Sequence, residues 1–211
     1  ATGSDAEKWL WWGRTFGHSQ EGMAEVEEVG WGVRRGVSIE TGIAQGGSLS
    51  RTASLLARLD LCEATEAREM LDPANPERCV VGVDIDIRAH NRAAIEAHPL
   101  ANRITMIQGS SIDDSIVAQV KAAVGDAKRV LVCLDSNHTH AHVLAELKAY
   151  APMVSPGSYC LVFDTVVEDL PAELSFDRPW APGNNPKTAV HEWLMERNDF
   201  EIDRSWDAKL I

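Results

Sequence analysis

Short apolar runs alternate with longer segments of mixed polarity along most of this chain. The mixed segments carry apolar residues at helical spacing, as in residues 49–61, where Leu55, Leu56 and Leu59 fall on one face. Further helices are predicted in residues 88–99, 112–124 and 187–198 and in the second half of residues 136–152. Strands are predicted in residues 37–40, 80–87, 103–109, 129–135, 157–164 and 200–206.

Most of these predicted strands are apolar throughout, as strands buried on both faces are. Their alternation with helices is typical of an α/β fold with a doubly wound, mostly parallel sheet, a Rossmann-like arrangement. Ligands of such sheets bind outside the carboxyl ends of the strands. The residues that close each strand therefore become the first candidates for function.

The first strand leads into a glycine-rich loop, with the sequence VSIETGIAQGGS in residues 37–48. Glycines such as Gly42 and Gly46 let a ligand approach the backbone closely, and Ser48 is expected to cap the following helix. Glu40 at the mouth favours a ligand with positive charge, such as S-adenosylmethionine, over the pyrophosphate of NAD. The spacing also differs from the G-x-G-x-x-G of dinucleotide folds. A plain strand-to-helix turn is the alternative.

Polar residues also close the second and third predicted strands. Asp84 stands where an acid can accept both ribose hydroxyls of an adenosine, whereas Asp86 fits better as a helix cap. Ser110 and Ser111 offer hydroxyl and backbone groups at the height of an adenine edge. A simple turn accounts for these serines equally well.

Asp135 and Asp164 close two strands that are expected to be adjacent, beyond the point where the strand order reverses. Two facing carboxylates repel each other, and a cation commonly lies between such groups. Oxygen ligands favour Mg²⁺, which would lower the pKa of a bound substrate hydroxyl. A buried pair that shares one proton is the alternative.

Three histidines, His138, His140 and His142, follow Asp135 within a few residues. Their spacing at a helix entry does not converge easily on one ion, and no cysteine joins them, so a zinc site is disfavoured. His138 is instead the candidate general base, because an imidazole titrates near neutral pH. Helix capping and surface exposure suffice to explain His140 and His142.

Composition narrows the class of protein further. The 211 residues suit one domain, and the net charge of −12 with no basic cluster opposes nucleic acid and anionic membrane surfaces as partners. No apolar run approaches the roughly 18 residues of a transmembrane helix. The four cysteines lack C-x-x-C spacing and are expected to be buried free thiols in a reducing compartment. We therefore expect a cytoplasmic protein.

The amino-terminal segment, residues 1–36, is rich in aromatic residues and is predicted to be separate from the rest of the chain. Trp9, Trp11 and Trp12 crowd near Phe16 within residues 1–36. This segment is expected to act as a lid over a pocket or as an interface in a homo-oligomer, unless it is only packed onto the core. Residues 37–211 form the predicted catalytic domain.

Several segments carry a resemblance to a known family: IETGIAQGGS, VVGVDIDIRAHNRAAIEAHP, RITMIQGSS, VCLDSNHTHAHVLAELKAYAPMVSPGSY, FDT and RPWAPGNNPKTAVHEWL. They resemble the cephalosporin hydroxylase family of class I S-adenosylmethionine-dependent methyltransferases, which includes rhamnosyl O-methyltransferases. The resemblance implies Mg²⁺ ligands at Asp135 and Asp164, although Phe163 stands where the family usually has Glu. It implies a methyl-donor site at Glu40, Gly42, Gly46, Ser48 and Asp84.

The resemblance also bears on the end of the chain. The implied fold normally returns through an antiparallel last strand near Ile211. We expect that strand to be missing here, either because the sequence stops short of it or because this member lacks it.

Together these observations predict an S-adenosylmethionine-dependent O-methyltransferase that acts on a hydroxyl of a small molecule, a natural product or a sugar, with help from Mg²⁺. Asp135 would position the acceptor and border the donor, Ser110 and Ser111 would complete the donor site, and His138 would be the base. Two other classes remain open. One is a nicotinamide-dependent oxidoreductase, and the other is a non-catalytic family member that supports a partner enzyme, which Phe163 makes credible.

Overall fold

A parallel sheet forms the centre of the molecule. The computed structural model describes residues 9–11, 14–16, 27–34, 36–175 and 177–204. Five strands are arranged in the order β5-β4-β3-β6-β7, and every neighbouring pair is parallel. The predicted doubly wound sheet is confirmed, with its order reversing between β3 and β6. The strands are β3 (Val37–Thr41), β4 (Cys79–Asp84), β5 (Ile104–Gln108), β6 (Val130–Leu134) and β7 (Cys160–Val162).

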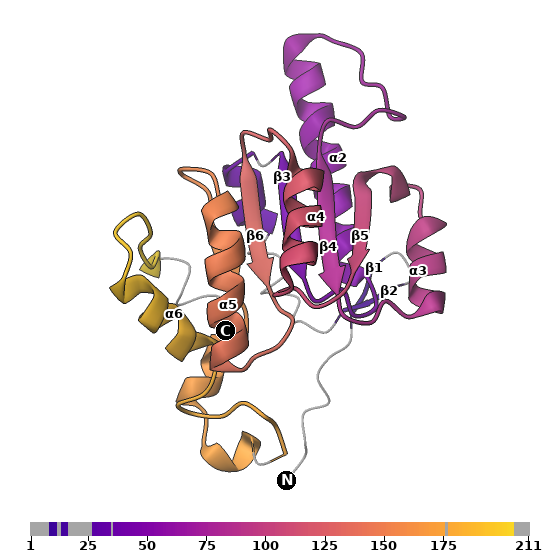
Figure 1. Ribbon diagram of the computed structural model, residues 1–211. Coiled ribbons are helices and arrows are strands. Elements are labelled where there is room, and N and C mark those ends of the chain that lie inside the picture. The colour runs from indigo at the N-terminus through magenta and orange to yellow at the C-terminus, as the bar shows by residue number, and fades with distance from the viewer. Residues whose placement is uncertain (1–8, 12–13, 17–26, 35, 176, 205–211) are drawn as a thin grey trace.

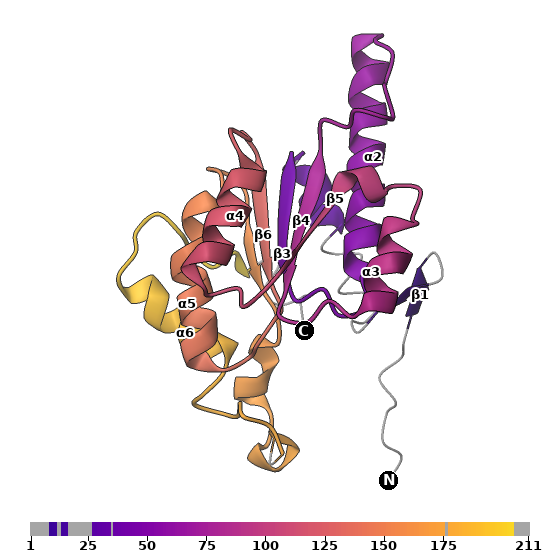
Figure 2. The same cartoon turned by 45° about the vertical axis from the view of Figure 1, so that its right-hand side comes forward.

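Helices cover both faces of this sheet (Figures 1 and 2). One face carries α2 (Gly47–Ala67) and α3 (Ala89–Glu96). The other carries α4 (Asp114–Val124), α5 (His140–Tyr150) and α6 (Pro186–Met195). Short 3-10 helices are η1 (Ala101–Arg103), η2 (Ala151–Met153), η3 (Thr165–Asp169) and η4 (Ala172–Ser175).

Side chains alternate between the two faces along each strand, which splits the core into separate clusters. On β3, Val37 and Ile39 pack in the cluster with α4, α5 and α6. On β4, Val80 joins the cluster of α2 and α3, whereas Val81 belongs to the opposite one. This alternation determines whether a residue near the end of a strand points toward α2 or toward α5.

Several predicted boundaries move by one to three residues, as for the strands Cys79–Asp84 and Cys160–Val162, and two predictions differ more from the structure. Helix α2 continues to Ala67 rather than ending near residue 61, because four of residues 62–67 are helix-favouring Glu or Ala and none is Gly or Pro. The predicted strand in residues 200–206 is wrong for residues 200–203, which have no regular structure. Residues 205–206 lie outside the described part of the chain.

The aromatic amino-terminal segment is described only in part. Strands β1 (Trp9–Trp11) and β2 (Arg14–Phe16) pair antiparallel, and this hairpin lies beside α2. Trp12 lies outside the described residues. The division at residue 36 and the role as lid or interface stay predictions.

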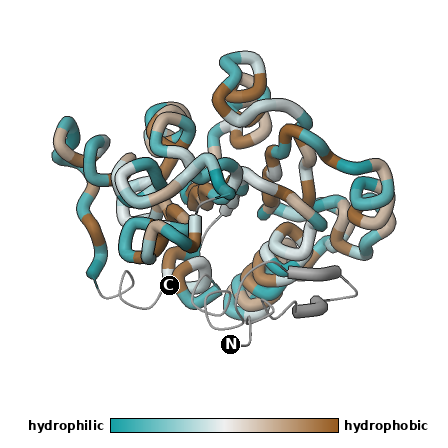
Figure 3. The backbone as a smooth tube through the Cα atoms, turned by 90° about the horizontal axis from the view of Figure 1, so that it is seen from below, coloured by the Kyte–Doolittle hydropathy of each residue, from teal (hydrophilic) through white to brown (hydrophobic). Residues whose placement is uncertain are grey.

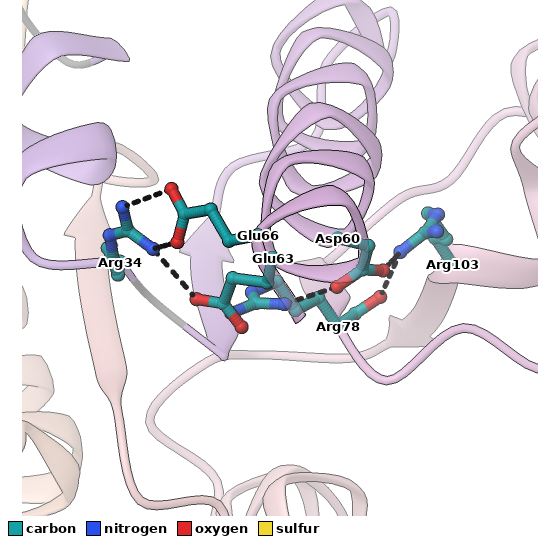
Figure 4. A network of polar contacts seen from close by, with 6 residues as sticks. All are labelled: Arg34, Asp60, Glu63, Glu66, Arg78 and Arg103. Atoms are coloured by element: carbon teal, nitrogen blue, oxygen red, sulfur yellow. Dashed lines mark hydrogen bonds and ion pairs between the residues drawn. The ribbon is translucent and has the colours of Figure 1, made fainter. Parts of the chain in front are cut away.

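Buried charges join α2 to the amino ends of β4 and β5 (Figure 4). Asp60 of α2 is 4% exposed and pairs with both Arg78 and Arg103, which are also buried. Arg78 also bonds Glu63 at 2.6 Å, and the Arg103 guanidinium donates to the Arg78 carbonyl at 3.1 Å. This network fixes the edge of the sheet opposite to the one where ligands are expected.

A view from below looks onto the carboxyl ends of the strands, with hydrophobic positions of the sheet surrounded by helices of mixed polarity (Figure 3).

Within the described residues, no helix combines the length and apolar character that crossing a membrane requires.

Candidate active site

The predicted site residues gather around the carboxyl edge of the sheet, at the ends of β3 and β4 and in the segments that follow the five strands. The loops after β3, β4 and β5 form one side of this edge, and those after β6 and β7 form the other. The strand order therefore separates the residues predicted for a methyl donor from those predicted for a metal and an acceptor.

Gly42 is required by a close approach of two loops. Its φ is +86°, and a Cβ built there would lie 2.1 Å from the carbonyl oxygen of Asp135. The amide of Asp135 in turn donates to the carbonyl oxygen of Thr41 at 3.1 Å and lies 3.2 Å from its hydroxyl. The glycine thus lets the loop after β3 cross the loop after β6, a packing reason that sequence analysis did not anticipate.

The start of α2 differs from the prediction. The helix begins at Gly47, its cap is Gly46 with φ of 79°, and no side chain caps it. Ser48 therefore lies inside the first turn, and the expectation that it caps the helix is wrong. Because no side chain in the described structure caps the first turn, its backbone N–H groups are suited to a polar ligand.

Glu40 is also not where it was predicted. It lies within β3, which continues to Thr41, and it is only 5% exposed. Its carboxylate accepts a hydrogen bond from the Thr52 hydroxyl of α2. The strand alternation directs Glu40 toward α2, so its carboxyl group is buried against this helix and not at an open mouth.

Asp84 shapes the glycine loop from the neighbouring strand. Its Oδ2 accepts the amides of Ile43 at 2.8 Å and Ala44 at 3.0 Å, and its Oδ1 accepts the amide of Asp86 at 2.9 Å. A carboxylate accepts about four hydrogen bonds, so Oδ1 retains capacity for a ligand hydroxyl. The predicted helix cap at Asp86 is wrong, since α3 is preceded by Arg88.

The serines after β5 have different surroundings. Ser111 is 5% exposed, with its hydroxyl 3.0 Å from His142 Nε2 and its carbonyl accepting from the Tyr150 hydroxyl at 2.6 Å. Ser110 is half-buried and its carbonyl accepts the amide of Asp113. Ser111 is therefore a structural link as well as part of the edge.

Two exposed isoleucines flank these polar groups and were missed by sequence analysis. Ile85 follows Asp84 and is 72% exposed, and Ile112 follows Ser111 and is 40% exposed. Since β4 and β5 are neighbours, both stand at the same edge. The signal was available, because each apolar residue comes directly after a polar one, at the end of β4 or a few residues beyond β5.

Asp135, His138 and Asp164 come together beyond β6 and β7. Each offers a ligand atom within 4.8 Å of the others, and His138 Nε2 lies 3.0 Å from Asp164 Oδ2. Asp164 has φ of 56°, and Phe163 before it packs with the apolar cluster of β6 and β7. The two predicted carboxylates thus meet, and the imidazole joins them.

Opposing influences act on the pKa of His138. Burial of the imidazole lowers the pKa, but the hydrogen bond and charge of Asp164, with the charges of Asp135 and Glu146, raise it above its ordinary value. The cluster therefore favours a positive charge at this position, whether a proton on the ring or a nearby cation.

The donor atoms fit a divalent cation. Two carboxylates and one imidazole can serve as ligands of such an ion. Among the described residues, these three form the group of three or more acidic, histidine or cysteine side chains that lie close enough to share an ion. Position 163 is Phe, which packs against the apolar cluster, so this position supplies no carboxylate to an ion. An ion bound here would be held by the carboxylates of Asp135 and Asp164, and water molecules would fill several of its other ligand positions.

The other two histidines join separate contacts. His140 lies 2.8 Å from the Thr188 hydroxyl and 3.0 Å from Glu192, so it clamps α5 to α6. The view of His142 as merely exposed is wrong, because its Nε2 lies within hydrogen-bond distance of the hydroxyls of Ser111 and Ser136.

Trp180 completes the surroundings of His138 and was not predicted. The two rings meet edge to face with centroids 4.8 Å apart, and the Arg178 guanidinium lies 5.4 Å from the Trp180 ring centre. Hydrogen bonds from Asn184 to the Pro179 carbonyl and from Gly183 to Glu168 fix the turn that carries the ring. Trp180 therefore forms a wall beside the acidic cluster.

Known proteins resemble this chain in sequence. Rhamnosyl O-methyltransferases of Mycobacterium tuberculosis and Mycobacterium bovis are 29% identical over 108 residues, which is 50% of this chain and 42% of theirs. The matched region thus spans less than half the length of these relatives.

Solved structures share the fold. CalS11, a TDP-rhamnose 3'-O-methyltransferase of calicheamicin biosynthesis, gives a TM-score of 0.56 at 18% identity, over 85% of this chain and 72% of its own. A CmcI structure with Mg and SAM gives 0.54 at 17% identity, over 89% and 65%. MycE of the mycinamycin pathway, in complex with Mg, SAH and mycinamycin VI, gives 0.53 at 19%, over 82% and 42%.

A family model covers nearly all of this sequence. The model for rhamnosyl O-methyltransferase/CmcI matches residues 5–211, which include every strand of the parallel sheet and every residue discussed above. The suspected resemblance is confirmed, and a nicotinamide-dependent oxidoreductase is not supported. This chain belongs to the rhamnosyl O-methyltransferase/CmcI family.

Proposed function

We propose that this chain transfers a methyl group from S-adenosylmethionine to a hydroxyl of a sugar or sugar-bearing natural product. The observation that carries the proposal is the pairing of two unlike sites on one sheet edge. The glycine loop and Asp84 lie on one side of the point where the strand order reverses, and Asp135, His138 and Asp164 lie on the other. Membership of the family gives the same reaction class.

The donor would lie over the loops after β3, β4 and β5. Asp84 Oδ1 would accept a ribose hydroxyl, the exposed side chains of Ile85 and Ile112 would cover the purine, and Ser110 and Ser111 would border its edge. The backbone at Gly42 and Gly46, with Ser48 in the first helical turn, would face the amino-acid end of the donor. Buried Glu40 adds negative charge below a ligand whose sulfonium and ammonium are positive.

Asp135 and Asp164 would hold Mg²⁺, and Asp135 would also border the donor. When bound, this ion would orient the acceptor hydroxyl and lower its pKa. In the transfer itself the acceptor oxygen attacks the methyl carbon, the carbon–sulfur bond breaks, and S-adenosylhomocysteine leaves as a neutral thioether. Proximity of the two reactants supplies much of the rate enhancement for such a step.

His138 would accept the proton that the acceptor hydroxyl loses. Its Nε2 lies against Asp164 Oδ2, which orients the ring and makes Nδ1 the atom that receives the proton. Trp180 beside this ring would contact the apolar face of the acceptor. The amino-terminal residues 1–36 remain our candidate for the element that excludes water or joins a second subunit.

A non-catalytic role is the second candidate, because Phe163 removes a carboxylate that the family usually has next to Asp164. Replacing Asp135 with Ala separates the two. An enzyme would lose nearly all methyl transfer while its affinity for S-adenosylhomocysteine stays within about twofold, whereas equal loss of both would make Asp135 structural. Failure of the wild-type chain to methylate any member of a panel of rhamnosides and sugar-bearing natural products would favour the supporting role.

We also propose a reducing compartment and a small-molecule partner for this reaction. All four cysteines, which lie in the described part of the chain, are free thiols, although only Cys133 is buried as predicted. The free thiols support work in a reducing compartment such as the cytoplasm. The acidic composition supports a small-molecule acceptor rather than nucleic acid or an anionic membrane surface as the partner.

A further inference from the structure

A fully buried acid lies just behind the metal and acceptor side of the edge. Glu146 of α5 is 0% exposed, and its Oε1 accepts a hydrogen bond of 2.7 Å from the Ser136 hydroxyl. Its Oε2 has no hydrogen-bond partner within the described structure. Burial of an incompletely bonded carboxylate is unfavourable, so an apolar side chain would stabilise the fold better at this position. Glu146 has no role in the steps of the proposed reaction.

The acid belongs to a chain of hydrogen bonds between two loops. Ser136 donates its hydroxyl proton to Glu146, so its oxygen is left to accept from His142, whose Nε2 lies 3.2 Å away. The same nitrogen lies 3.0 Å from the Ser111 hydroxyl and 3.6 Å from Glu146 Oε1. The Tyr150 hydroxyl fixes the Ser111 carbonyl from the other side. One imidazole thus connects the loop after β5 with the loop after β6.

The place of this chain in the fold suggests its use. Ser136 directly follows Asp135, and the loop that it begins carries His138 two residues later. Ser111 stands on the donor side of the edge. We infer that Glu146, His142 and Ser136 form a positioning network that holds the Asp135–His138 loop in register with the donor side. This inference rests on the proposed function, and none of the three residues is a catalytic residue in it.

A matched control exists in the same molecule. Asp60 is also a buried carboxylate of a long helix, but it binds Arg78 and Arg103 at the opposite edge of the sheet (Figure 4). Replacing it with Asn removes a buried charge without touching the candidate site. A purely structural role for Glu146 would make Glu146→Gln behave like Asp60→Asn.

The experiment compares the wild-type chain with Glu146→Gln, Ser136→Ala and Asp60→Asn. Mn²⁺ is the probe of the metal side, followed by electron paramagnetic resonance in saturating S-adenosylhomocysteine, and calorimetry gives the affinity for S-adenosylhomocysteine. We expect Glu146→Gln and Ser136→Ala each to weaken Mn²⁺ binding about tenfold or more, as loss of groups behind metal ligands does, with the nucleoside affinity within about twofold. Asp60→Asn should lower only the melting temperature.

Each other outcome overturns the inference in a recognisable way. Unchanged Mn²⁺ affinity in Ser136→Ala contradicts positioning, even if Glu146→Gln binds less, because the effect is then one of charge alone. If these variants lose affinity for Mn²⁺, affinity for S-adenosylhomocysteine and thermal stability together, the role of the network is structural. If Glu146→Gln does not fold, Ser136→Ala at the surface decides alone. A wild-type chain that binds neither probe contradicts the proposed function, and the inference falls with it.

Discussion

The pair of His138 and Asp164 shows how one contact defines a site at the scale of single residues. The sequence predicted different roles for these residues, a base and a metal ligand, and the structure brings His138 Nε2 to 3.0 Å from Asp164 Oδ2. The carboxylate both orients the ring and favours its charged form. The chemistry of either residue therefore has to be tested through the other.

The charge on His138 gives a pH dependence with a definite sign. In the metal-free chain its pKa is raised in the folded state, so the stabilisation is fully present below the unfolded pKa and is lost as the pH rises through the folded pKa. Asp164→Asn should bring the pKa back toward its ordinary value and reduce stability mainly on the acid side. Histidine titration by nuclear magnetic resonance, with His138→Gln to assign the signal, measures this. An unchanged pKa in Asp164→Asn would show that the contact does not control the charge.

Trp180 gives a second prediction at the residue scale. If its ring contacts the acceptor, Trp180→Ala should raise the KM for a sugar acceptor roughly fivefold to tenfold, since contacts of one aromatic ring are worth about 1 kcal/mol. Affinity for S-adenosylhomocysteine should not change. Leu61→Ala is the control, because Leu61 is 57% exposed on α2 and follows Asp60, at the opposite edge of the sheet. An equal rise of KM in both variants would contradict a contact between Trp180 and the acceptor.

At the scale of elements, the buried charges between α2, β4 and β5 hold the edge opposite the site. Asp60→Asn leaves the guanidinium groups of Arg78 and Arg103 with a lost partner, and breaking a buried ion pair in this way costs about 3 to 5 kcal/mol. Denaturant unfolding should show this loss. Glu66→Gln, which removes the exposed pair with Arg34, should cost much less stability, because solvent screens an exposed ion pair. Similar effects of the two changes would mean that burial does not strengthen the network.

The elements also show what could be predicted from the sequence. Apolar strands between amphipathic helices indicated the parallel sheet, and the strand ends correctly brought Asp84, Asp135 and Asp164 to one edge. The errors are local. Glu40 was taken for the end of a strand that runs one residue further, and that register determines its burial. Contacts of His142 and Trp180 come from segments distant in sequence, and no local pattern encodes such packing.

In the whole molecule, the sheet edge is divided between the side proposed for the methyl donor and the side with the acidic cluster. The family match extends over nearly the whole sequence, while the curated relatives are more than twice as long as the region they share. The acceptor is therefore a matter for direct assay. The methyl donor is the ligand whose proposed site is defined most fully by residues of this chain.

Calorimetric titration of the chain with S-adenosylhomocysteine tests that claim most directly. We predict saturable binding of one nucleoside per chain, which Asp84→Ala weakens strongly because the glycine loop loses both hydrogen bonds to the carboxylate and the ribose loses its acceptor. NADH should not compete. Absence of binding at millimolar nucleoside, or displacement by NADH, would contradict a methyl-donor site on this edge of the sheet.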